Sequence, residues 1–168
     1  MILFFKSFIF ACQGLWFCLR HERNFRIHLV AAAYVLAFAP SFSLSATEWA
    51  ILIITLALVM SAEAINTAVE HAVDLSSPNI DPTARIAKDT AAAAVLICTI
   101  ASVVVGIILF YRPQALMALW TGIWDKPWKL LLIVFSLFIS LLFIIKGGPE
   151  KNISVKYQDG ESGKKTSE

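Results

Sequence analysis

The sequence predicts an all-α integral membrane protein, with an N-terminal surface helix, three core transmembrane helices and an additional fourth one. Hydrophobic residues make up 58% of its 168 positions, and the mean hydropathy of +0.74 is well above that of soluble domains. Four apolar stretches are separated by short polar segments. Each must be helical, because backbone that faces lipid has to satisfy its own hydrogen bonds. The net charge of +2 gives no sign of nucleic acid as a partner.

Residues 1–26 are predicted to form an amphipathic helix in the membrane interface. Lys6, Gln13 and Arg20 recur every seven residues, on a segment otherwise rich in Phe, Leu and Trp. This spacing gives one narrow polar stripe, which is typical of a helix that lies on a bilayer. A short helix that crosses the membrane is the alternative.

Residues 27–112 are predicted to form the three-helix core, with apolar stretches at 28–44, 48–75 and 84–111. An external loop at 113–127 then leads to the additional transmembrane helix, WKLLLIVFSLFISLLFIIK, at 128–146. The polar residues 147–168 are predicted to be a disordered cytoplasmic tail.

The distribution of Lys and Arg predicts the orientation. Basic residues lie before the first apolar stretch, between the second and third, and after the fourth, whereas the turn at 45–48 has none. The positive-inside rule therefore places both termini and the 76–88 connection in the cytoplasm.

The second stretch ends in an unusual polar face, SAEAINTAVEHAVD (61–74). At about 100° per residue, Glu63, Asn66, Glu70 and Asp74 fall within an arc of roughly 80°. Glu63 lies roughly 22 Å along the helix from Glu48, inside a hydrocarbon core of about 30 Å, and Glu70 lies near the headgroups at roughly 33 Å. Charges at such depth usually face a protein interior and serve a function.

This polar face suits chemistry between a lipid and a soluble phosphate. Glu63 suits a proton acceptor, Glu70 suits a hard cation such as Mg²⁺, and Asn66 can donate to a phosphate oxygen. The same side chains could instead hydrogen-bond helices together or conduct ions. No Walker loop or kinase-type glycine-rich loop is present in the sequence to decide between catalysis and ion passage.

EAINTAVEHAVDL, followed by ARIAKDTAAAAVLI, closely resembles the prokaryotic diacylglycerol kinase and undecaprenol kinase family. HERNFRIH, at 21–28, resembles the family's segment between surface helix and first membrane helix, in the Gram-positive version that favours undecaprenol. The resemblance covers about residues 8–111. It implies a trimeric enzyme of the bacterial plasma membrane that transfers the γ-phosphoryl group of ATP to a lipid alcohol with Mg²⁺.

The resemblance also implies roles for four acidic and amide residues. Glu63 matches the family's proposed general base, which takes the proton of the lipid hydroxyl. Asn66 matches an amide close to the transferred phosphate. Glu22 and Glu70 match the carboxylates that bind the metal and the nucleotide phosphates. Without the resemblance, Glu22 would be interpreted as part of a solvated interfacial cluster.

Lys88 and Asp89 match the family's KD pair, which contacts the nucleotide. Considered alone, Lys88 indicates only that this end of the helix faces the cytoplasm, and Asp89 is a favourable acid in the first turn of a helix. Asp74 is expected to have a structural role, with Arg85 as its candidate partner.

The chain departs from the family in two places: its fourth apolar stretch is additional, and near the N-terminus only Lys6 is an obvious polar candidate for adenine contacts. The prediction is an ATP- and Mg²⁺-dependent undecaprenol kinase. Diacylglycerol is the alternative substrate, and an ion- or proton-conducting bundle is the alternative class of function.

Overall fold

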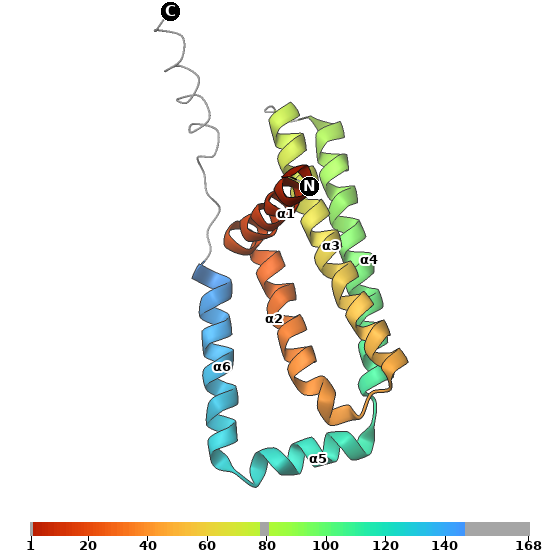
Figure 1. Ribbon diagram of the computed structural model, residues 1–168, viewed down its shortest axis with the longest axis vertical. Coiled ribbons are helices and arrows are strands. Elements are labelled where there is room, and N and C mark those ends of the chain that lie inside the picture. The colour runs from red at the N-terminus through yellow and green to blue at the C-terminus, as the bar shows by residue number, and fades with distance from the viewer. Residues whose placement is uncertain (1, 78–80, 147–168) are drawn as a thin grey trace, which may run out of the picture.

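The computed structural model describes residues 2–77 and 81–146, and this part of the chain folds into helices without a strand (Figure 1). The elements in order are α1 (Ile2–His21), α2 (Arg23–Phe38), the 3₁₀ helix η1 (Ala39–Phe42), α3 (Ala46–Ser76), α4 (Pro82–Phe110), α5 (Pro113–Trp124) and α6 (Pro127–Lys146). Four segments are long and apolar enough to span a bilayer: α2 with η1, α3, α4 and residues Trp128–Lys146 of α6. The predicted all-α membrane fold is confirmed. The predicted tail, 147–168, lies outside the described residues.

The corner between α1 and α2 turns the chain from α1, which crosses α3, into the long helix α2 (Figure 1). Glu22 adopts an extended conformation, with φ −95° and ψ 114°, and so separates the two helices. The Arg26 guanidinium donates hydrogen bonds to the carbonyl oxygens of Leu19 at 3.3 Å and Arg20 at 2.9 Å. These carbonyls belong to the last turn of α1, where a cation is favourable because the helix dipole is negative there.

At the other end of the bundle, a polar cluster ties the turn between η1 and α3 to the end of α4. Ser43 adopts a left-handed conformation with φ 49°, and Ser45 and Glu48 form a capping box at the start of α3. Arg112 pairs with Glu48 and donates to the carbonyl oxygen of Phe42 at 2.6 Å. One guanidinium therefore fixes the ends of three helices.

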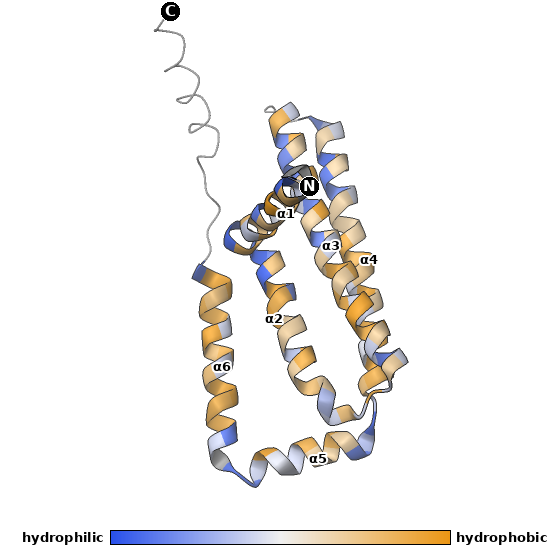
Figure 2. Ribbon diagram, viewed as in Figure 1, coloured by the Kyte–Doolittle hydropathy of each residue, from blue (hydrophilic) through white to orange (hydrophobic). Residues whose placement is uncertain are grey.

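The apolar core lies between these ends. Ala39, Leu52 and Leu109 are buried together, and partly buried side chains of α2, α3 and α4 pack around them. The antiparallel helices α3 and α4 lie side by side along most of their length (Figure 1). Hydrophilic residues gather at one end of this pair and near α1, which leaves an apolar middle section (Figure 2).

The segment predicted as a loop at 113–127 contains the helix α5, so that part of the prediction is wrong. Pro113 and Pro127 each stand at the first position of a helix, where the missing N–H costs nothing. In α5, Trp120 and Trp124 pack edge to face with ring centroids 5.7 Å apart, and such aromatic residues suit a membrane interface.

The additional helix α6 runs back beside α2, and its largely apolar stretch lies between Lys129 near its start and Lys146 at its end (Figures 1 and 2). The Tyr34 hydroxyl of α2 lies 3.0 Å from the Ser136 hydroxyl and 3.1 Å from the Ser140 hydroxyl. These hydrogen bonds attach α6 to the core within the span.

Candidate functional site

Three carboxylates come together where the α1–α2 corner meets α3, and we call Glu22, Glu63 and Glu70 the carboxylate cluster. Glu22 is the extended residue of the corner, and the other two lie two helical turns apart on one face of α3. Both Glu22 and Glu70 lie close enough to Glu63 to repel it electrostatically. Only 2% of Glu63 is exposed. The structure therefore gathers three of the predicted site residues.

Two amides line the same cluster. Asn66 donates from Nδ2 to Glu70 Oε1 at 2.9 Å. Its Oδ1 atom is buried and has no hydrogen-bond partner among the described residues, so this acceptor could accept a hydrogen bond from a ligand. The Asn24 side chain lies close to the Glu63 carboxylate. Sequence reasoning missed Asn24, although it lies inside the quoted HERNFRIH motif.

The helix α1 contributes a thiol and an aromatic ring to the surroundings of the cluster. Cys18 is buried beside Thr67, Glu22 and Glu63, and this burial, with the Glu22 charge, raises the pKa of its thiol. The Phe17 ring packs edge to face on His71 at 5.2 Å, and His71 Nε2 lies 3.8 Å from Glu22 Oε1. These contacts hold α1 and the corner against α3. No sequence pattern indicated them, because they depend on how two helices cross.

Lys88 and Asp89 of α4 have different surroundings. The Lys88 ammonium pairs with Asp74, one helical turn beyond Glu70 on α3. Asp89 pairs instead with Arg85 at 3.7 Å, and both side chains are largely exposed. The expected pairing of Asp74 with Arg85 is therefore wrong. The register of α4 against α3 presents Lys88 to Asp74, whereas Arg85 and Asp89 share an outer face.

The donor set of the cluster fits a magnesium ion that arrives with phosphate. Within residues 2–77 and 81–146, no three His, Cys, Asp or Glu side chains form a ready-made metal site. Mg²⁺ typically uses only one or two carboxylates and completes its octahedron with phosphate oxygens and water. Glu22 and Glu70 can supply those two carboxylates. Among the described residues, no Lys or Arg pairs with the three acids, and His71 is the basic side chain nearest to Glu22.

An apolar cavity of about 300 Å³ lies between α2, α3 and α4, next to the buried end of the cluster. Its lining includes Leu52, Leu56, Val59 and Met60 of α3, and Met60 precedes Glu63 by three residues on the same side of the helix. The site thus joins the apolar cavity to the carboxylate cluster, with the buried Glu63 at their boundary. This arrangement can hold an alcohol with an apolar chain against a metal-bound phosphate.

Comparison with known proteins identifies relatives of this region. The family described as prokaryotic diacylglycerol kinase matches residues 9–110, which run from α1 to the end of α4. An undecaprenol kinase of Bacillus subtilis is 42% identical over 107 residues, covering 64% of this chain and 87% of that protein. A diacylglycerol kinase of Synechocystis is 42% identical over 108 residues, covering 64% of this chain and 62% of its own length. A diacylglycerol kinase of Helicobacter pylori is 33% identical over 93 residues, or 55% of this chain and 73% of that protein.

Proposed function

Because this chain belongs to the prokaryotic diacylglycerol kinase family, whose members are kinases of lipid alcohols, we propose that it transfers the γ-phosphoryl group of ATP to undecaprenol. The observation that carries the proposal is the buried Glu63, which lies between the other two acids of the carboxylate cluster and an apolar cavity. A soluble phosphoryl donor and a lipid hydroxyl can meet at such a boundary. We further propose that the enzyme acts in the bacterial plasma membrane as a trimer, with both termini in the cytoplasm.

In this mechanism Glu63 accepts the proton of the lipid hydroxyl as that oxygen attacks the γ-phosphorus of ATP. The bond from this phosphorus to the β–γ bridging oxygen breaks, and ADP leaves. A base of this kind contributes about 10²–10⁴-fold in rate. The neighbouring Asn24 side chain helps to orient the carboxylate. The hydrogen bond from Asn66 to Glu70 fixes the amide beside the transferred group. Positioning of this kind is the main contribution a protein makes to phosphoryl transfer.

The remaining acids and one lysine hold the nucleotide. Glu22 and Glu70 bind Mg²⁺, which neutralises charge on the phosphates when it is bound. Lys88 lies near the same end of α3 through its pairing with Asp74, and its ammonium neutralises further phosphate charge. Asp89 contacts the nucleotide from the outer face of α4, where only Arg85 pairs with it among the described residues.

Undecaprenol is favoured as the acceptor because the Bacillus subtilis undecaprenol kinase is 42% identical and the chain covers 87% of it. The apolar cavity suits the part of an isoprenoid chain nearest the hydroxyl. Diacylglycerol is the second candidate, since the Synechocystis diacylglycerol kinase has the same identity.

A panel of lipid alcohols tests both class and substrate. The purified full-length chain, supplied with labelled ATP and Mg²⁺, is expected to label undecaprenol faster than diacylglycerol and to lose activity when EDTA removes the metal. Faster labelling of diacylglycerol would overturn the choice of acceptor. Absence of transfer to every alcohol, together with ATP-independent ion flux across liposomes, would overturn the kinase assignment in favour of a conducting bundle.

A further inference from the structure

A second groove lies on the other side of the α1–α2 corner, between that corner and the end of α6. Its volume is about 610 Å³. We call it the basic groove, because it combines cations from three helices with an apolar wall; it is lined by Leu19, Arg20, Arg26, Ile139, Leu142, Phe143, Ile145 and Lys146. No carboxylate is among these described lining residues. The groove does not include any residue of the carboxylate cluster.

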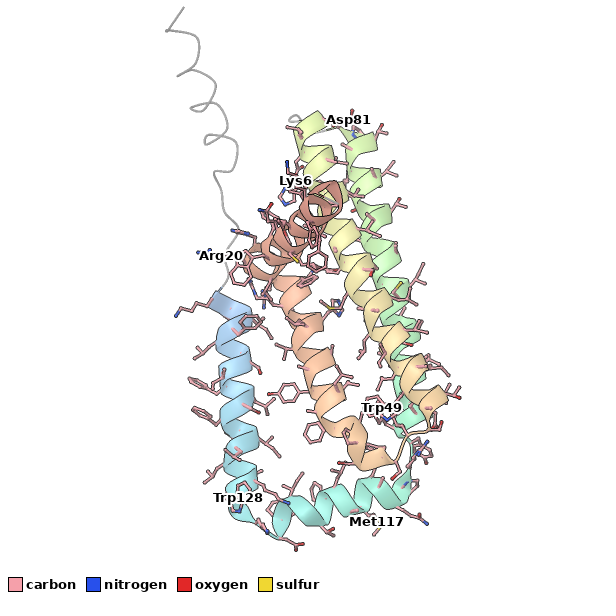
Figure 3. The ribbon with its side chains drawn as sticks, viewed as in Figure 1. Lys6, Arg20, Trp49, Asp81, Met117 and Trp128 are labelled. Atoms are coloured by element: carbon pink, nitrogen blue, oxygen red, sulfur yellow. The ribbon has the colours of Figure 1, made fainter. Side chains whose placement is uncertain are left out.

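The positive charges of the groove come from three helices, α1, α2 and α6, which meet at the same end of the bundle. Arg20 lies in the last turn of α1, on the side nearest to the end of α6 (Figure 3), and Lys146 is the last residue of α6. Arg26 is only 1% exposed, and its guanidinium caps the carbonyls of Leu19 and Arg20. This capping reduces the negative potential at the end of α1. The exposed Arg20 and Lys146 charges can then act on an anion.

The wall below these charges is apolar. Ile139, Leu142 and Phe143 descend along α6 towards the middle of its span. A ligand that matches the whole groove therefore carries a negative group at the level of the helix ends and a hydrocarbon chain beneath it. An anionic phospholipid has this form, and basic pockets between transmembrane helices are known to bind such headgroups.

We propose that the basic groove binds one anionic phospholipid of the surrounding leaflet, with its phosphate between Arg20 and Lys146 and an acyl chain along α6. The bound lipid joins α6 to the α1–α2 corner. This joint supplements the Tyr34 hydrogen bonds, which attach α6 nearer the middle of its length. Since α6 lies outside residues 9–110 matched by the family, the groove is a feature of this chain and does not depend on the proposed kinase mechanism.

The test measures lipid binding directly, by native mass spectrometry of the full-length chain in nonionic detergent. The wild type is expected to retain dioleoylphosphatidylglycerol in preference to dioleoylphosphatidylcholine at equal concentration. Each basic group near an anionic lipid contributes a factor of about five in affinity, so the double variant Arg20→Gln, Lys146→Gln should bind phosphatidylglycerol about 30-fold more weakly. The single variant Lys146→Gln should lose about fivefold.

Arg85→Gln is the matched control, because it removes an exposed positive charge (85% side-chain exposure) that does not line the groove. It should leave binding of phosphatidylglycerol unchanged. Equal retention of both phospholipids by the wild type would overturn the proposal, as would unchanged affinity in Lys146→Gln. Competition of phosphatidylglycerol by millimolar inorganic phosphate would also contradict it, since it would mean that the apolar wall contributes nothing. If Arg85→Gln lost as much affinity for phosphatidylglycerol as Lys146→Gln, the lipid would be attracted only by the net charge of the protein, and this result would also overturn the proposal.

Discussion

At the scale of single residues, the site depends on acids that are costly to bury. Glu63 is nearly inaccessible and is repelled by Glu22 and Glu70, while Asn24 beside it is neutral. Among the described residues, no Lys or Arg pairs with the three acids, and only His71 lies near Glu22. Buried acids of this kind commonly serve a function, which here is the proposed binding of a cation.

Glu70→Gln tests this dependence on a cation. The substitution keeps the size of the side chain and an oxygen that can accept from Asn66, but removes one negative charge. Since a hydrogen bond or contact to a charged group contributes about 1.5–3 kcal/mol, binding of Mg²⁺–ATP should weaken about 10- to 100-fold. Isothermal titration calorimetry measures the affinity.

Asp125→Asn serves as its control, since it neutralises a carboxylate at the C-cap of α5, far along the chain from the cluster. It should bind Mg²⁺–ATP as the wild type does. Unchanged affinity in Glu70→Gln would remove Glu70 from the metal site.

At the scale of helices, much of the site was predictable because a regular helix fixes which residues share a face. The 3.6-residue period alone placed Glu63, Asn66 and Glu70 together, and the structure shows the predicted proximity of Glu63 and Glu70. The period does not show how one helix packs on another. Asn24 and Cys18 reach the cluster only because α1 and α2 meet at Glu22 and pack on α3, so no local pattern indicated them.

Two other helix-scale features were predicted wrongly for related reasons. The helix α5 is short, and the segment 113–127 was predicted as an external loop; Pro113 begins the helix, where proline is favourable. Asp74 had two basic candidates three residues apart on α4, and only the register of α4 against α3 selects Lys88 over Arg85.

Tyr34→Phe tests the attachment of α6 to α2. The change removes the hydroxyl that bonds to Ser136 and Ser140 and keeps the ring. Hydrogen bonds between membrane helices contribute about 0.6 kcal/mol each, so the loss should be about 1 kcal/mol, or roughly 2–4 °C in Tm. Tyr111→Phe is the control, because Tyr111 is 76% exposed. Equal Tm values for both variants and the wild type would show that these bonds do not stabilise the packing.

At the scale of the whole molecule, the helices bring an apolar cavity and a polar surface to one buried carboxylate. The cavity lies between α2, α3 and α4, and the carboxylate cluster lies where the α1–α2 corner meets α3. All of these elements belong to the region matched by the family, whereas α5 and α6 extend beyond it. In the proposed mechanism, this arrangement separates the binding of the soluble donor from that of the lipid, with Glu63 between them.

Glu63→Gln therefore tests the central claim most directly, in a measurement that compares turnover with nucleotide binding in one preparation. Loss of the proton acceptor should lower the rate of phosphoryl transfer to undecaprenol by about 10²–10⁴-fold. Glutamine has the same shape and leaves Glu22 and Glu70 in place, so the affinity for Mg²⁺–ATP should stay within a few-fold of wild type. Full turnover in Glu63→Gln, with the variant folded and binding nucleotide, would contradict the role of Glu63 as the base and with it the account of the site.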